Sequence, residues 1–180
     1  MENQATTTRQ EPGILTGLFS DKESSESAYK SLRDRGYSDD DINVIMSDET
    51  RKKYYANDDK SKLGSKAAEG TGVGGLVGGT LGAIIAGVAA IGTNLVLPGL
   101  GLVVWGPLAA ALAGAGAGGL TGGLVGALVG WGIPEDRAVV YENAIKNGGT
   151  VLGVNPRSTE DADALENDWK ANHRGQEIYR

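Results

Sequence analysis

The stretch Gly114-Ala-Gly-Ala-Gly-Gly-Leu-Thr-Gly-Gly-Leu-Val-Gly-Ala-Leu-Val-Gly130 lies inside a run of 65 residues, 70–134, that carries no charged side chain. Its glycines recur every four residues, and residues four apart share one face of a helix. An earlier copy, 44 residues upstream, repeats the pattern. Small residues at this spacing let two helix backbones approach closely. We therefore predict helix-packing faces formed by Gly74, Gly78, Gly82, Gly114, Gly118, Gly122, Gly126 and Gly130.

The two copies predict two apolar helices over residues 70–91 and 108–131. At about 1.5 Å per residue they are about 33 and 36 Å long, enough to cross a hydrocarbon layer of about 30 Å. The uncharged connector 92–107 would turn at the far interface with Trp105 as an anchor, or lie shallowly and make the hairpin re-entrant. Trp131 would mark the near interface. Alternatively, a soluble oligomer buries the same hairpins against one another.

Composition excludes several classes of protein. The 180-residue chain has a formal net charge of −6, which argues against nucleic acid as a partner. It has no cysteine, and hence no disulfide, thiolate or zinc–sulfur chemistry. Residues 1–12 are polar, so we expect a disordered tail and no secretory signal.

The region before the apolar run predicts a β-α-β unit. Residues 13–19 are expected to form a strand, and Ser20 with Glu23 has the spacing of a capping box for a helix that starts near residue 21. That helix should end at Gly36. A second strand is expected over 42–46.

The region after the apolar run repeats this pattern. Pro134 begins a predicted helix that Gly148-Gly149 ends, and residues 150–154 form a strand. Ser158 or Thr159 caps an acidic helix, and 176–179 is a last short strand. Two such units predict an α+β fold, a ferredoxin-like β-α-β-β-α-β domain interrupted by an apolar glycine-zipper hairpin. The expected divisions are a tail 1–12, a first half 13–46, a polar connector 47–69, the hairpin 70–132, and a helix plus second half 133–180.

Several polar and aromatic groups are candidates for binding or catalysis. The polar connector 47–69 is either a short solvated helix with a linker or a stretch lying on anionic lipid headgroups. Asp39-Asp40-Asp41 fits a turn better than a cation site. His173, the single histidine, suits a helix end, and no partner for a catalytic base is visible. Larger aromatic residues are interpreted as packing residues, namely Tyr37, Tyr54, Tyr55 and Trp169.

Two glycine patterns, at 70–75 and 114–119, match the dinucleotide-binding fingerprint. That fingerprint requires a preceding strand and an acidic residue about 20 positions further on. Residues 62–69 do not have the pattern of a strand, and no acidic residue occurs between residue 70 and Glu135. We interpret both matches as consequences of glycine density.

Other motifs carry a family resemblance. They are Gly17-Leu18-Phe19-Ser20-Asp21, Leu32 to Tyr37, Ile42 with Val44, Gly132-Ile133-Pro134-Glu135, Tyr141-Glu142 and Gly148-Gly149. In this order the chain resembles the bacterial general-stress and low-temperature-induced proteins with a heat-induced-stress (YflT-type) domain. The resemblance spans nearly the whole chain beyond the tail. It implies a non-enzymatic bacterial stress protein and brings no catalytic residues.

The expected function is therefore a stress-response protein that associates with the lipid bilayer and with itself through its glycine zipper. We expect a homo-oligomer at the cytoplasmic membrane with the polar domain in the cytoplasm, or a soluble cytoplasmic assembly. A ligand-sensing ferredoxin-like module or an enzyme is the rival from another class. We expect no catalytic, cofactor-binding or metal residues, no nucleic acid and no small-molecule substrate.

Overall fold

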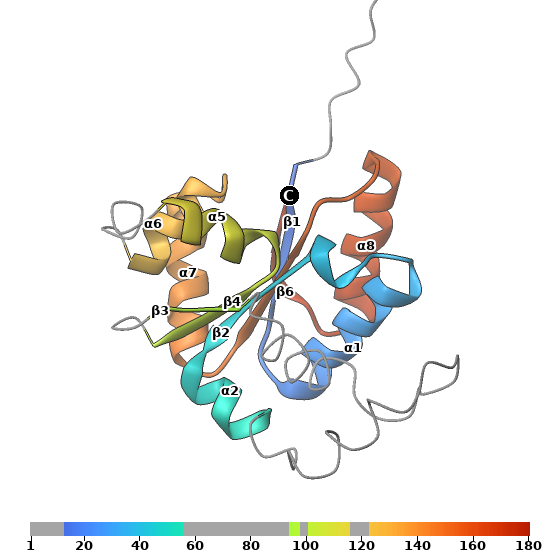
Figure 1. Ribbon diagram of the computed structural model, residues 1–180. Coiled ribbons are helices and arrows are strands. Elements are labelled where there is room, and N and C mark those ends of the chain that lie inside the picture. Colours follow the sequence, from blue (N-terminus) through green and yellow to red (C-terminus); the bar gives the residue numbers. More distant parts are fainter. Residues whose placement is uncertain (1–12, 56–93, 98–100, 116–122) are drawn as a thin grey trace, which may run out of the picture.

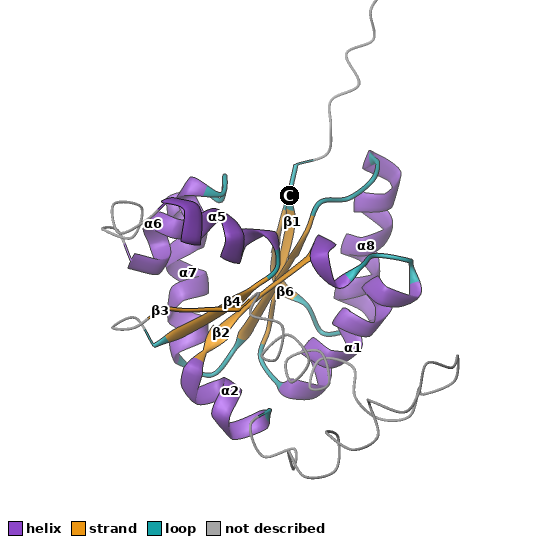
Figure 2. Cartoon of the chain, viewed as in Figure 1, coloured by secondary structure: helices purple, strands orange, loops and turns teal. Residues whose placement is uncertain are grey.

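The structure is a computed structural model that describes residues 13–55, 94–97, 101–115 and 123–180. Within these residues the chain has a mixed α+β fold, with helices packed on an antiparallel sheet (Figures 1 and 2). The strands are β1 (Leu15–Phe19), β2 (Ile42–Ser47), β3 (Asn94–Leu97), β4 (Leu102–Trp105), β5 (Thr150–Val154) and β6 (Gln176–Tyr179). The helices are α1 (Lys22–Asp34), α2 (Asp48–Tyr54), α5 (Pro107–Ala115), α6 (Gly123–Gly130), α7 (Glu135–Lys146) and α8 (Thr159–Asn172).

The strands form one sheet in the order β3-β4-β2-β5-β1-β6. Each neighbouring pair is antiparallel. Strand β1, from the first half, lies between β5 and β6, from the second half. The sheet is therefore built by segments far apart in the sequence, and the elements predicted for both flanks of the apolar run are confirmed.

The predicted connector 92–107 is not a simple link. Residues within it form the hairpin β3–β4, which extends the sheet beyond β2. Val103 and Trp105 of β4 point to one face of the sheet, and Leu102 and Val104 point to the other. A short apolar run of this kind is typical of a strand buried on both faces. Trp105 is 4% exposed in the core, so its prediction as an interface anchor is wrong.

The predicted continuous helix 108–131 is also wrong. The chain forms α5 and, later, α6, and residues 116–122 lie outside the described ranges. Gly123 has a φ of 64°, a left-handed conformation that interrupts a right-handed helix. In the described part of the chain, no helix combines the length and apolar character needed to cross a bilayer.

Helices cover both faces of the sheet (Figure 1). One face packs against α1 and α8, and the core there includes Leu15, Phe19, Tyr29, Leu32, Val44, Trp105, Leu152, Leu165 and Trp169. The other packs against α5, α6 and α7, and its core includes Leu18, Ile45, Val104, Leu108, Leu112, Leu124, Leu128, Tyr141, Ile145 and Val151. Part of the apolar run thus belongs to the core of the same domain.

Glycines in the adjacent strands β1 and β5 make room for tryptophans on opposite faces. A Cβ on Gly17 would lie 2.8 Å from Cε3 of Trp169, and a Cβ on Gly153 would lie 2.6 Å from Cη2 of Trp131. Phe19 meets the Trp169 ring edge-on, with centroids 5.4 Å apart. Trp131 is therefore a packing residue over β5, rather than only a marker of an interface.

The helix starts agree with the predictions except at one cap. Asp21, and not Ser20, is the N-cap of α1, where its carboxylate accepts a 2.8 Å hydrogen bond from the Ser24 backbone N–H. Ser158 caps α8 by accepting from the Asp161 N–H. Asp is as favourable as Ser at an N-cap, so the one-residue shift costs nothing.

The start of the polar connector is partly integrated into the domain. Residues 48–54 form the short helix predicted there, but Thr50 and Tyr55 are buried, so this helix is docked rather than freely solvated. The Asp48 carboxylate pairs with Arg51 and Lys52, and hydrogen bonds from these side chains lower its pKa. Residues 56–69 of the connector lie outside the described ranges.

Asn43 joins the first half of the domain to the apolar segment. This buried side chain of β2 accepts a 2.7 Å hydrogen bond from the Leu108 N–H in the first turn of α5. It thereby satisfies a backbone donor that a helix leaves without an internal partner. Gly106, with a φ of 89°, allows this approach, because a Cβ there would lie 2.3 Å from the Ile42 carbonyl oxygen.

Candidate functional site

The predicted glycine face is described only in part. Gly126 and Gly130 lie on α6, whose Leu124, Ala127 and Leu128 are buried toward the sheet. A Cβ added at Gly126 or Gly130 would meet nothing within 4 Å. These two glycines therefore do not serve close packing within the described domain.

The remaining members of the glycine face are placed as follows. Gly114 lies near the end of α5. The others lie outside the described residues, namely Gly74, Gly78, Gly82, Gly118 and Gly122. Their packing against a partner helix stays a prediction.

Apolar side chains accompany this open glycine face. Val129 of α6 is 43% exposed, and Val139 and Val140 of α7 are 42% and 39% exposed. α6 and α7 are consecutive helices that pack against each other. α6 thus has an uncharged surface of small residues with an exposed valine, and the neighbouring helix α7 has two more exposed valines.

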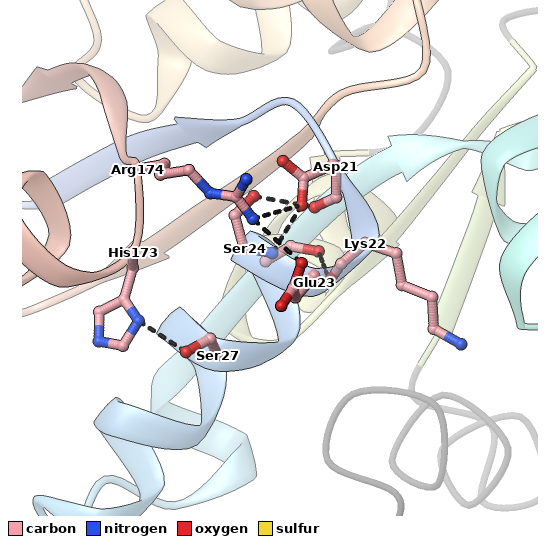
Figure 3. A network of polar contacts seen from close by, with 8 residues as sticks. Asp21, Lys22, Glu23, Ser24, Ser27, His173 and Arg174 are labelled. Atoms are coloured by element: carbon pink, nitrogen blue, oxygen red, sulfur yellow. Dashed lines mark hydrogen bonds and ion pairs between the residues drawn. The ribbon is translucent and has the colours of Figure 1, made fainter.

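A second cluster surrounds His173 at the end of α8, where it contacts α1 (Figure 3). The Ser27 hydroxyl lies 2.8 Å from Nδ1 of His173. Nε2 of the same ring lies 3.4 Å from a carboxylate oxygen of Asp168. The His173 and Asp168 side chains are 12% and 16% exposed, while Ser27 lies at the surface. The hydroxyl of Ser27, the imidazole of His173 and the carboxylate of Asp168 thus lie in series.

Asp168 is held in place by its own neighbours. Its other carboxylate oxygen accepts a 2.8 Å hydrogen bond from the Asn172 amide. The Arg35 guanidinium lies 3.7 Å from the oxygen that faces His173. Burial raises the pKa of Asp168, but the hydrogen bonds from Asn172 and Ser31 and the nearby Arg35 charge act in the opposite direction, and the pKa is lowered overall. An ionised carboxylate beside Nε2 favours the tautomer with a proton on Nε2. Nδ1 is then the acceptor for the Ser27 hydroxyl.

Charged side chains border this cluster. Arg174, with a φ of 53°, reaches back to Asp21 and Glu23 at 3.3 Å (Figure 3). A shallow hollow of about 550 Å³ lies beside Ser27. It is lined by Lys22, Glu23, Glu26, Ser27 and Lys30, two cationic and two anionic side chains around the hydroxyl.

Sequence reasoning missed this cluster because its parts are far apart. Ser27 and His173 are separated by 146 positions. Asp168 is close to His173 in sequence, and an acid five residues before the only histidine is a weak signal that was available. The predicted place of His173 at a helix end is confirmed, since it is the C-cap of α8.

The other polar groups singled out in the sequence have structural roles. Asp39–Asp41 form a short 3-10 turn, in which Asp39 accepts a 2.6 Å hydrogen bond from the Tyr29 hydroxyl. Tyr37 donates to Asp161, and Tyr55 and Trp169 are buried. Within the described ranges, no group of three His or acidic side chains is arranged to hold a metal ion.

Tyr141 anchors β6 from the opposite face of the sheet. Its hydroxyl donates to the Glu177 carbonyl at 2.6 Å and lies 2.9 Å from the Thr16 hydroxyl. Burial raises the pKa of Tyr141 to about 12. Glu177 adopts a φ of 48° at the irregularity in the β1–β6 pairing and forms an ion pair with Arg137.

Comparison with known proteins gives no relative: no family model, no curated protein and no solved structure matches the chain.

Proposed function

We propose that this protein is a non-enzymatic bacterial stress-response protein that associates with itself, and with the cytoplasmic membrane, through its glycine-rich apolar segment. The polar domain lies in the cytoplasm in this proposal. The observation that carries it is the open glycine face of α6, where Gly126 and Gly130 have no neighbour within 4 Å of a Cβ position. Stress association rests on the family resemblance of the sequence motifs.

The physical reason is the function of glycine in helices. Glycine costs about 1 kcal/mol relative to alanine in a helix interior, so a repeated glycine needs a compensating contact. Gly126 and Gly130 give no such contact to the described domain. A second helix, from a neighbouring copy or from the first glycine repeat, would recover dispersion energy along this face.

We infer that the domain itself is a ferredoxin-like β-α-β-β-α-β sandwich. The strand order β6-β1-β5-β2, with α1 after β1 and α8 after β5, supports this inference. The hairpin β3–β4 and the helices α5 to α7 are additions to it, and they cover the face opposite α1 and α8.

A soluble cytoplasmic assembly is the second candidate. It is favoured by the burial of Leu108, Leu112 and Leu128 against the sheet, since these side chains of the apolar run are already used by the domain core. The two candidates share the glycine face and differ in what surrounds it, lipid or protein.

The test uses Gly126→Leu and Gly130→Leu in the full chain, with Gly13→Leu as the matched control. All three positions have open space for a side chain, and only Gly13 lies outside the glycine register. Cross-linking and sedimentation velocity should show loss of the oligomer in the first two variants only. Unchanged assembly would show that this face is not the contact surface.

Flotation with vesicles of anionic phospholipid at neutral pH separates the two candidates. A floating protein supports membrane association, and an oligomer that stays at the bottom supports the soluble assembly. Neutral pH matters because the buried Tyr141, with a pKa of about 12, makes the fold sensitive to alkaline extraction.

A further inference from the structure

We propose that Ser27 is a modification site, a serine activated by His173 that accepts a small acyl group from an activated ester or thioester. This goes beyond self-association and uses the opposite face of the sheet. The observations that carry it are the 2.8 Å contact between the Ser27 hydroxyl and Nδ1, the 3.4 Å approach of Asp168 to Nε2, and the hollow beside Ser27.

The arrangement contains a nucleophile, a base and a group that orients the base. Two elements supply them, Ser27 from α1, and Asp168 and His173 from the end of α8. Asp168 is fixed by Asn172 and Arg35, so the imidazole is oriented by a carboxylate that does not depend on Ser27. Such a set is recognised by its geometry and roles rather than by its order in the sequence.

The surroundings define the class of substrate. Among the described lining residues, Lys22 and Lys30 balance Glu23 and Glu26, so these four side chains together neither attract nor repel a charged acyl group. Its shallow shape suits a short chain. An acetyl group is the simplest acyl group that fits these conditions.

The reaction balances without a further reactant. The Ser27 oxygen attacks the carbonyl carbon, and Nδ1 of His173 takes the hydroxyl proton. The bond between the carbonyl carbon and the leaving oxygen or sulfur then breaks, and that atom receives the proton from Nδ1. The products are an O-acyl serine and an alcohol or thiol.

The expected outcome is a single modification rather than turnover. Ser27 lies in the interior of α1, where its backbone N–H is used by the helix. Efficient acyl transfer needs N–H donors aimed at the developing oxyanion. The Ser27 backbone N–H is therefore not available as such a donor, which limits the hydrolysis of an acyl group on Ser27.

The test treats the full-length protein with p-nitrophenyl acetate and locates the acetyl group by peptide mass spectrometry. Ser38 is the internal control, because it is an exposed serine whose hydroxyl contacts the Asp41 carboxylate at 2.6 Å without a histidine. A general base contributes about 10²–10⁴-fold, so we expect Ser27 to react about 100-fold faster than Ser38. Similar rates at the two serines, or no reaction at Ser27, would overturn the proposal.

Variants separate base catalysis from simple exposure. His173→Gln should reduce the Ser27 rate to that of Ser38, with an unchanged rate at Ser38 and an unchanged thermal midpoint. Persistence of the Ser27 reaction in His173→Gln contradicts the proposal. Ser27→Ala, at an exposed position, should leave the fold intact and remove the acetyl group from that peptide.

Asp168 acts as a positioning residue, and its effect can be measured on the tautomer of the His173 imidazole. Because the chain has one histidine, its imidazole nitrogen signals in NMR are unambiguous. We expect the Nε2-protonated tautomer in the native protein and a mixed tautomer in Asp168→Asn, with about tenfold slower acetylation of Ser27. A tautomer that is unchanged in Asp168→Asn would overturn this role.

Discussion

The helices on the two faces of the sheet differ in composition, although α7, on the second face, carries charges as α1 and α8 do. On one face, α1 and α8 carry many charges outward and bury residues such as Leu32 and Trp169. On the other, α5 and α6 carry no charge at all, yet α6 buries Leu124 and Leu128 just as completely. The difference teaches that an uncharged helix can be an ordinary part of the core of an α+β domain, with one side facing the sheet.

The largest expected effect tests whether both faces belong to one cooperative domain. Leu32→Ala and Leu128→Ala make the same truncation on opposite faces, at side chains that are fully buried. Each should lower the free energy of unfolding by about 2–5 kcal/mol, through lost burial and the cavity left behind. Urea denaturation followed by circular dichroism measures both. If Leu128→Ala left the transition unchanged, α6 would not be part of the domain core.

The corner between β4 and α5, where Gly106 lies, should also be sensitive to substitution. Gly106→Ala places a Cβ against the Ile42 carbonyl, whereas Gly101→Ala has the same left-handed backbone but open space. Left-handed strain costs about 1–2 kcal/mol and overpacking typically about 1–3 kcal/mol more. Gly106→Ala should therefore lower the thermal midpoint clearly further than Gly101→Ala. Equal losses would mean that the β4–α5 corner relaxes without cost.

Substitutions at Gly17 of β1 and Gly153 of β5 compare the two faces directly. Gly17→Ala meets Trp169, which is fully buried, and Gly153→Ala meets Trp131, which is half-exposed beside a hollow of about 380 Å³. Both substitutions should destabilise the fold by about 1–3 kcal/mol, with Gly17→Ala the worse of the two. Trp131 has room to move aside and Trp169 does not. Thermal melts of the two variants, measured side by side, check the order.

Alkaline pH should weaken both faces. Burial raises the pKa of Tyr141 on one face and of Tyr37 on the other to about 12, against an ordinary value of 10.0. A raised folded-state pKa gives stability that is complete below pH 10 and is lost as pH rises through 12. Tyr141→Phe and Tyr37→Phe should each flatten the fall in the free energy of unfolding between these values. Urea midpoints measured at three pH values above 9 would show a parallel fall if the tyrosines were not responsible.

The smallest expected effect concerns the open side of α6. Gly130→Ala has no neighbour to displace and removes a poor helix former, so it should stabilise the isolated domain by about 0.5–1 kcal/mol. The measurement is the thermal midpoint at low protein concentration, where assembly is absent. A destabilisation would indicate that another helix already occupies this face in the monomer.

Sequence patterns predicted the flanks of the domain well because their helices are amphipathic. Ala28, Leu32, Leu165 and Trp169 recur at helical spacing among charged residues, so the buried side was visible. The strands at 42–46 and 150–154 were visible as short apolar runs between turns. The residue types that start or stop helices, here Gly36, Pro134 and Gly148, marked the helix ends.

The apolar run was harder to interpret because it has no charged residues to distinguish a solvent-facing side from a buried side. With no polar side to mark the surface, length and hydropathy alone favoured two spanning helices over 70–91 and 108–131. The β-branched and aromatic residues in Leu102–Trp105 were the available sign of a strand, and the uniform apolar composition around them hid it. The positive φ of Gly123, which ends the continuity of the second helix, has no signature in a stretch where glycine is everywhere.

The His173 cluster was out of reach for a different reason. Its contact with Ser27 depends on α1 and α8 lying side by side, a tertiary relation that no local pattern encodes. The motif Gly17-x-Phe19-x-Asp21, by contrast, was noticed and now has a physical basis. Gly17 and Phe19 receive Trp169, and Asp21 caps α1.

The position of β1 between β5 and β6 has a consequence for synthesis on the ribosome. Of the described strands, β1 pairs only with these two, and residues 15–19 must wait for residues 150–179 before any of their ladder bonds form. Closure over so long a chain is slow. The nascent chain therefore exposes its entire uncharged run before the sheet that covers part of it can assemble. That interval is when a chaperone or another apolar surface competes with folding.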